Sequence, residues 1–132
     1  MRSSPVHKLG ALQLKILKHL WEHSEATVSD VHSAIGAPQA LAYTTIATMM
    51  RKMEARGLVS HRVDGRAFIY KADVSSNEVT GSIAHDILDR VFQGSVTAML
   101  SHLLTTREVS QDEIKDLEKL IQQKKRNKHA RE

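Results

Sequence analysis

Apolar positions between residues 42 and 57 recur every three or four residues. Ile46, Met49, Met50 and Met53 therefore lie along one face of a predicted helix. The glycine at the end of this segment can adopt the positive φ that commonly follows the last turn of a helix. The pattern predicts an amphipathic helix that stops at this glycine.

The opposite face of this helix is polar and cationic. Hydroxyl and guanidinium groups on an exposed helix can contact phosphate oxygens and base edges in a major groove. Many exposed helices carry such residues and bind nothing, so the helix alone does not establish DNA binding. The DNA contacts expected from it are Tyr43, Thr44, Thr45, Thr48, Arg51 and Lys52.

A basic hairpin is predicted directly after the helix. Residues 59–71 contain two alternating strand-like runs joined by Asp64-Gly65, a strong hairpin signal. We expect Arg62 and Arg66 to lie near its tip and to reach a phosphate or a minor groove. A recognition helix followed by a basic hairpin is a winged helix, and this combination favours DNA binding.

Two further helices precede the recognition helix. Residues 9–23 are amphipathic, and the segment from Thr27 to Asp30 reads as a capping box for a second helix that ends at Gly36. Three short helices with these connections form a helix-turn-helix. The predicted core of this part is Leu12, Ile16, Leu20, Val31, Ile35, Ile46, Met50 and Phe68.

Three more amphipathic helices are predicted after Asp73, with a break at Gly94-Ser95 and a second capping box at residues 110–113. They could pack back on the N-terminal part of the same chain. We favour dimerisation, because one recognition helix reads only a few base pairs and a two-fold pair reads more. The residues expected in the dimer contact are Ile83, Ile87, Val91, Phe92, Val96, Met99, Leu100, Leu103, Leu117, Leu120 and Ile121.

The predicted fold class is mainly α with a small β-hairpin, in three parts. Residues 1–73 form a winged-helix DNA-binding domain, residues 74–123 a helical dimerisation domain, and residues 124–132 a basic, disordered tail. Their formal charges are +4, −4 and +4, which sum to the net charge of +4. A basic front half beside an acidic second part suggests that the front half faces phosphate.

Several classes of protein are disfavoured by composition. There is no cysteine for a disulfide or a thiolate metal site, and no apolar run approaches the ~18–20 residues of a membrane span. The first ten residues lack the apolar core of a signal peptide. The sequence therefore predicts a cytoplasmic protein without membrane insertion.

Enzymatic motifs are also missing from the sequence: there is no HExxH, no glycine-rich phosphate loop and no nucleophile elbow. His19 and His23 are spaced i, i+4 on the first helix, which can place two imidazoles on one metal. Without an obvious third ligand, we interpret them as a solvated face. No catalytic residue, metal or cofactor is predicted.

The combination of motifs resembles the penicillinase-repressor family, which also includes the methicillin-resistance regulator and the copper-operon repressor. The resemblance extends from Leu9 to about Ile121, and its most specific parts are the segments AYTTIATMM and GRAFIY. It implies a winged-helix repressor that dimerises through C-terminal helices and binds inverted repeats over promoters. The matching recognition-helix and wing positions are Thr44, Thr45, Thr48, Arg51, Arg62 and Arg66.

Two departures from that family concern the inducing signal. In antibiotic-sensing members, a signal from a membrane-linked protease leads to cleavage at an Asn-Phe bond in the fifth helix, where this chain has His102-Leu103. The copper-responsive branch carries Cys-X-Cys motifs that are missing here. The resemblance therefore implies a repressor, with a membrane sensor or protease encoded nearby as a candidate partner, and leaves the inducer open.

The function predicted from the sequence is a dimeric repressor that binds an inverted-repeat operator. One alternative is a nonspecific, nucleoid-type DNA binder whose basic tail supplies most of the affinity. Another is a winged-helix module that binds protein through its wing.

Overall fold

The structure is a computed structural model that describes residues 9–131, so that residues 1–8 and Glu132, parts of the predicted first domain and tail, lie outside it. It contains two compact units, one ending at Ile87 and the other beginning at Leu88. The sequence placed the division after Asp73. The difference arises because Val74 and Val79 are buried in the core of the first unit.

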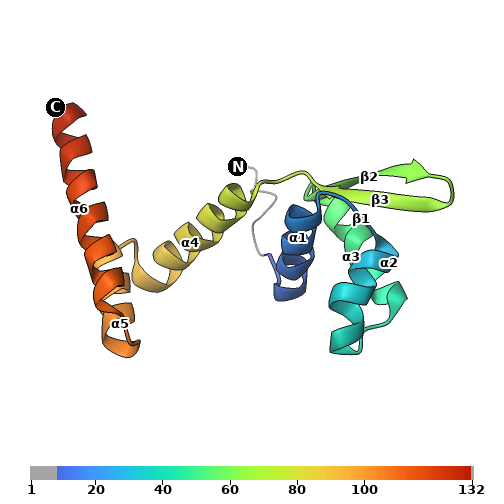
Figure 1. Cartoon of the computed structure of the whole chain (residues 1–132), viewed down its shortest axis with the longest axis horizontal. Helices are drawn as coiled ribbons and strands as arrows, with labels where there is room; N and C mark the ends of the chain where they lie inside the picture. The colour runs from blue at the N-terminus through green and yellow to red at the C-terminus, as the bar shows by residue number, and fades with distance from the viewer. Residues whose placement is uncertain (1–8, 132) are drawn as a thin grey trace. The chain divides into compact units, whose positions relative to one another are not determined.

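The first unit contains the predicted helix-turn-helix (Figure 1), with α1 (Ala11–His23), α2 (Val28–Val31) and α3 (Tyr43–Ala55). The capping box at the start of α2 is present. Thr27 Oγ1 accepts a hydrogen bond from the Asp30 amide at 3.1 Å, and Asp30 Oδ2 accepts one from the Thr27 amide at 3.0 Å. These bonds satisfy donors that the first turn of a helix otherwise leaves free.

The sequence predicted that the second helix ends at Gly36, but in the structure the helical segment extends beyond this residue. It continues through a π turn, η1 (His32–Gly36), and a 3₁₀ turn, η2 (Ala37–Gln39), and Ala40 then takes the left-handed conformation at φ 57°. Gly36 has helical dihedrals, and a Cβ there would lie 2.8 Å from side-chain atoms of both His32 and Ile46. Its role is therefore to let α3 pack closely.

The end of α3 matches the prediction. Gly57 has φ 79°, the Gly57 amide donates to the Glu54 carbonyl at 3.0 Å, and the Leu58 amide donates to the Met53 carbonyl at 3.0 Å. This pair of bonds is the Schellman motif, which satisfies carbonyls of the last turn. The chain is thereby turned directly into the first long strand of the wing.

The wing is part of a three-stranded antiparallel sheet of order β1-β3-β2, in which β1 (Ala26–Thr27) was not predicted. The hairpin strands are β2 (Val59–Asp64) and β3 (Ala67–Ala72), and Asp64 pairs with Ala67. The two turn residues are therefore Gly65 and Arg66, one position later than predicted. Gly65 has φ 62°, a value that favours glycine at the first central position of a type II′ turn.

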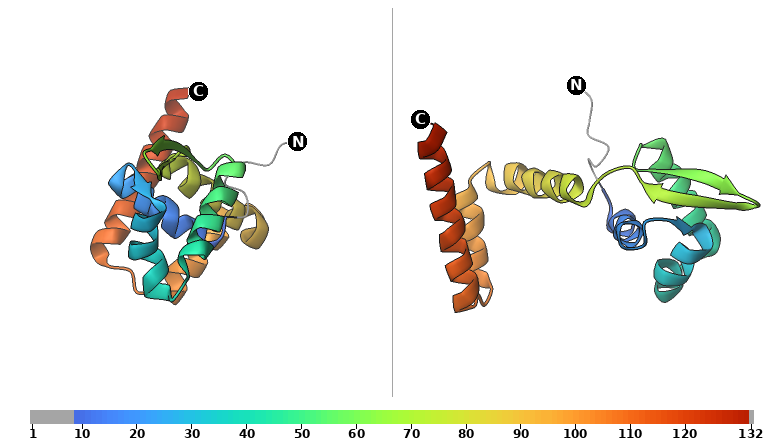
Figure 2. Two further views of the ribbon diagram at one scale, coloured as in Figure 1. Left: turned by 90° about the vertical axis from the view of Figure 1, so that its right-hand side faces the viewer. Right: turned by 45° about the horizontal axis from the view of Figure 1, so that its top comes forward.

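The core of the first unit contains residues of α1, α2, α3, α4 (Ser76–Phe92) and all three strands. Phe68, predicted to be in this core, is 45% exposed, whereas Tyr70 on the same strand is 1% exposed. The two side chains share one face of β3, but Phe68 lies nearer the tip of the hairpin, which projects from the helices (Figure 2). The largest fully buried side chains are Ile16, Leu17, Leu20, Val31, Ile46, Met50, Met53, Leu58, Val59, Tyr70 and Val79.

The second unit begins within α4 (Ser76–Phe92) and adds α5 (Val96–Thr106) and α6 (Gln111–Arg131). The predicted break is present, with Gln93 and Gly94 at positive φ, and α5 and α6 lie side by side in Figures 1 and 2. Helix α6 continues through residues 124–131, where the sequence predicted a disordered tail. Lys, Arg and Gln favour helix without any apolar periodicity, so the absence of that periodicity was a poor guide.

The second unit contains no core of its own. No side chain described between Leu88 and Ala130 is buried. Leu120 and Ile121, predicted to be buried in the sixth helix, are 61% and 50% exposed. The exposed large apolar residues of this part of the chain are Val91, Val96, Leu103, Leu104, Leu120 and Ile121.

Candidate nucleic-acid interface

The recognition helix has one buried and one exposed face, as the sequence predicted. Ile46, Met50 and Met53 are 0% exposed and fix α3 on the core. All the predicted contact residues lie on the exposed side: Tyr43, Thr44, Thr45, Thr48, Arg51 and Lys52. The structure thus brings these six side chains to one accessible surface.

Two residues of this surface are joined to each other. Arg51 Nη2 donates a hydrogen bond to Thr48 Oγ1 at 3.3 Å, one helical turn earlier. The hydroxyl therefore helps to orient the guanidinium group along the helix. A change at Thr48 affects both its own contacts and the position of Arg51.

The start of α3 is held by His32, which the sequence analysis did not identify. Its Nε2 donates to the Leu41 carbonyl at 2.9 Å, and its ring meets the Tyr43 ring edge-on, with centroids 5.9 Å apart. These contacts fix the loop between the second and third helices. In the sequence, a single histidine near the end of the second helix is only weak evidence for such a contact.

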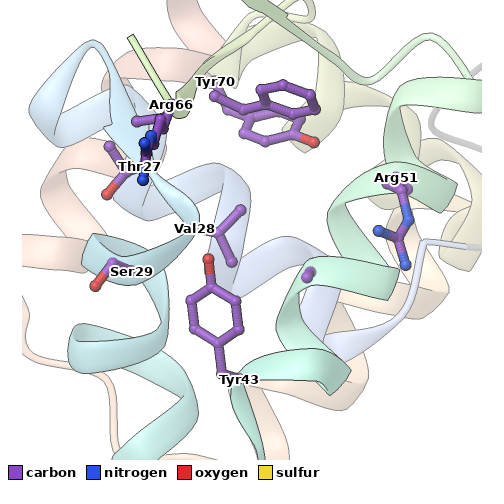
Figure 3. Close-up of a pocket in the computed structure, with 10 residues that line it drawn as sticks. Thr27, Val28, Ser29, Tyr43, Arg51, Arg66 and Tyr70 are labelled. Atoms are coloured by element: carbon purple, nitrogen blue, oxygen red, sulfur yellow. The ribbon is translucent and has the colours of Figure 1, made fainter. Parts of the chain in front are cut away.

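A groove of about 510 Å³ separates the recognition helix from the wing (Figure 3). Tyr43, Ala47 and Arg51 of α3 line one wall, and the start of α2 and strand β3 form the others. Arg51 and Arg66 lie on opposite sides of it in Figure 3. Two cationic groups beside hydroxyl groups suit an anionic oxygen ligand such as phosphate.

Two more residues of the groove can donate hydrogen bonds. Thr27 and Ser29 lie at the start of α2 and line the groove (Figure 3), and Ser29 is an exposed residue. The pKa of Tyr70, at the base of the wing, is raised mainly by burial.

The two wing arginines have different surroundings. Arg66 lies in the turn and lines the groove. Arg62 forms a two-point ion pair with Glu25, with Nε to Oε2 at 3.1 Å and Nη2 to Oε1 at 3.2 Å. This hydrogen bonding raises the pKa of Arg62 and lowers that of Glu25. The sequence predicted a DNA contact at Arg62 and did not identify Glu25.

The inner face of the wing is connected to the recognition helix. His61 Nδ1 lies 2.6 Å from Glu54 Oε1 of α3. The His61 ring also stacks on Phe68, with centroids 4.2 Å apart and an interplanar angle of 17°. These contacts couple the direction of the hairpin to that of α3.

The histidine pair on α1 does not form part of a larger cluster. The rings of His19 and His23 stack at 4.1 Å, and His23 Nδ1 lies 2.9 Å from the His19 carbonyl oxygen. Within residues 9–131, no three His, Cys, Asp or Glu side chains are grouped to hold a metal ion. No helix in the same range has the length and apolar character needed to cross a bilayer.

The model of the penicillinase repressor family matches residues 9–123. The chain belongs to this family. Its penicillinase repressor relative from Bacillus licheniformis is 23% identical over 93% of this chain and 96% of its own length. The transcriptional regulator BlaI of Mycobacterium tuberculosis is 33% identical over 74% of this chain and 72% of its own.

The methicillin resistance regulatory protein MecI of Staphylococcus aureus is 17% identical over 89% of this chain and 96% of its own length. The solution structure of the DNA-binding domain of the repressor BlaI superposes with a TM-score of 0.51 at 23% identity, covering 59% of this chain and 93% of that one. It confirms the winged-helix fold. Membership of a repressor family also confirms that the protein is a regulator of transcription and not an enzyme.

Residues predicted for a dimer contact of this chain are buried to different extents within the chain. Ile83 packs against the core of the first unit. Phe92, Met99, Leu100 and Leu117 are half-buried in their own chain. The members exposed in their own chain are Ile87, Val91, Val96, Leu103, Leu120 and Ile121.

Proposed function

We propose that the protein is a homodimeric transcriptional repressor that binds an inverted-repeat operator in double-stranded DNA. The single observation that carries this proposal is the groove between α3 and the wing. There, Arg51 and Arg66 flank hydroxyl groups beside an exposed recognition helix. A duplex engages such a surface with the helix in the major groove and the wing on the backbone or minor groove.

The dimer is supported by the second unit. Val91 and Val96 are each 58% exposed, and Leu120 is 61% exposed. Exposed apolar residues of this size mark a surface that another protein covers. A second copy is the partner we propose, because two recognition helices about 34 Å apart match an inverted repeat in the duplex.

Operator binding is tested by a gel shift of the full chain against its own upstream region and a random duplex over a range of KCl concentrations. We expect a discrete complex with the upstream region at moderate salt. Equal affinity for both duplexes would instead support a nonspecific binder, an alternative favoured by the exposed basic end of α6 at Lys124, Lys125, Arg126 and Lys128. A protein-binding module would bind neither duplex.

Release from the operator is proposed to depend on a partner sensor or protease. The support is the family resemblance alone, because His102-Leu103 inside α5 stands where the antibiotic-sensing members have the cleaved Asn-Phe bond. The genes beside this one test the proposal, since a membrane metalloprotease-type sensor encoded there would favour proteolytic derepression. Incubation with that protease should then yield two fragments.

Substitutions on α3 are expected to separate sequence preference from sequence-independent affinity. Thr48→Ala should relax preference at one base pair by about 1 kcal/mol, because it removes a hydroxyl and a methyl from the middle of the exposed face. Lys52→Ala should weaken binding to all sequences alike and lower the salt slope by about one, as loss of a phosphate contact does. Titration of operator variants at several KCl concentrations measures both.

Thr48→Ser is the control, because it keeps the hydroxyl that bonds Arg51. A uniform loss from Thr48→Ala with a base-specific loss from Lys52→Ala would mean that α3 lies in the groove in another orientation.

Arg66→Ala is expected to reduce affinity most for operators with A·T-rich flanks. The reason is that a narrow A·T minor groove has an enhanced negative potential, which attracts a guanidinium group from the turn of the wing. Binding of operators with A·T-rich and G·C-rich flanks measures the difference, and circular dichroism checks the fold. Lys71→Ala removes the same charge from the last part of β3, away from the turn, and should show no flank dependence.

A further inference from the structure

One arginine of the wing is occupied by a carboxylate of its own chain. Arg62 lies on β2 and Glu25 directly precedes β1, with β3 between these strands. The guanidinium group reaches across β3 and donates from Nε and Nη2 to the two carboxylate oxygens at 3.1 and 3.2 Å. A backbone phosphate binds an arginine with the same two-point geometry.

The pair is open to solvent. The Arg62 side chain is 57% exposed and that of Glu25 is 44% exposed. Exposed ion pairs are weak and screened by salt, so this pair can open when another anion arrives. Arg62 can therefore leave Glu25 and bind another anion, and the pair does not fix the two strands rigidly.

Each member of the Arg62–Glu25 pair has a second neighbour of opposite charge. Lys71 lies close enough to Glu25 to lower the pKa of that carboxyl, after the larger effect of Arg62. Glu25 therefore keeps a cationic neighbour after Arg62 leaves. Asp64 acts on Arg62 in the same attractive sense as Glu25, although more weakly.

We propose that Glu25 is an internal competitor for DNA phosphate: it holds Arg62 in the free protein, and Arg62 exchanges it for a backbone phosphate in the complex. This inference rests on the proposed function, because the incoming ligand is the operator duplex. It assigns a role to a residue outside the recognition helix and the wing.

Glu25 lowers affinity for every DNA sequence to a similar extent. The ion pair presents no net charge to the duplex, whereas Arg62 alone presents one positive charge. The competition therefore reduces sequence-independent binding without touching the base-reading face of α3. The repressor then depends more on sequence contacts to remain on DNA.

The test compares Glu25→Gln with the wild type in the full chain, using the operator and a random duplex over a KCl series. We expect Glu25→Gln to bind both duplexes roughly two- to fivefold more tightly, as release of an exposed ion pair permits. The salt slope should stay close to that of the wild type, because Arg62 makes the same phosphate contact in both complexes. Glu22→Gln is the matched control, since it removes the same charge from the exposed end of α1.

A double-mutant cycle with Arg62→Gln locates the effect. In the Arg62→Gln background, Glu25→Gln should tighten binding no more than Glu22→Gln does. Equal effects of the two glutamate changes in the native background would overturn the proposal, as would a gain that survives loss of Arg62. Weaker binding by Glu25→Gln would also overturn it, and would show that the pair is needed to hold the wing in place.

These outcomes are distinct from a failure of the proposed function. If the wild type binds operator and random duplex equally, the operator proposal fails, while the competition still predicts tighter binding by Glu25→Gln. If the wild type binds neither duplex, both proposals fail.

Discussion

Removing residues 88–132 is expected to leave a folded monomer whose operator affinity is about 10²–10⁴-fold lower than that of the full chain. The fragment keeps α3 and the wing, so each half-site contact remains. It loses the helices that link two recognition helices, and the second half-site is then no longer bound as an almost intramolecular event. Sedimentation and operator titration of both proteins measure the two effects.

The position of this cut follows from burial in α4. The sequence suggested a cut after Asp73, but Val79 is fully buried and Ile83 packs on the same core. The Trp21 indole also donates to the Val74 carbonyl at 2.9 Å. A fragment ending at Asp73 would lose these contacts and much of its stability, whereas one ending at Ile87 keeps them.

A single charge should reproduce the effect of the deletion. Leu120 is 61% exposed in its own chain, so Leu120→Asp leaves the monomer intact but places an unpaired carboxylate in the proposed dimer contact. Gln123→Asp, at an exposed polar position of α6, is the control and should not split the dimer. A monomeric wild type, or a fragment that binds as tightly as the full chain, would refute the dimeric model.

The second large effect is expected at Gly36. Gly36→Ala should lower the free energy of unfolding by about 1–3 kcal/mol, because the new Cβ would lie 2.8 Å from atoms of both His32 and Ile46. Relief of that overlap displaces α3, so operator affinity should fall as well. Urea unfolding and operator titration measure the two consequences.

Gly81→Ala is the matched control for this change. It lies within α4 with nothing within 4 Å of its added Cβ. The same substitution should there raise the free energy of unfolding by about 0.5–1 kcal/mol, through helix propensity alone. Equal effects at both positions would show that α3 does not depend on close packing at Gly36.

Local signals in the sequence predicted much of the fold. The apolar stripe of α3, the glycine after it and the capping box at Thr27 each involve residues within about four positions of one another. Such signals do not depend on the rest of the chain. The exposed polar face of α3 followed directly, because its buried side was identified correctly.

Features that depend on distant contacts were not predicted. The role of Gly36 comes from its approach to Ile46, and the local sequence resembles a helix stop. Phe68 and Tyr70 lie on the same face of β3 in the alternating pattern, but only Tyr70 is buried in the core. The partner of Arg62 is 37 residues away in sequence, in a strand arrangement that periodicity does not reveal.

The lack of a core in the second unit also determines how repression depends on the amount of protein. If each subunit can cover its exposed apolar side chains only with another copy, assembly follows the square of the subunit concentration. When most subunits are single, halving their number lowers the number of dimers about fourfold by mass action. A modest fall in synthesis, or dilution by cell growth, would therefore empty the operator more sharply than it depletes the protein.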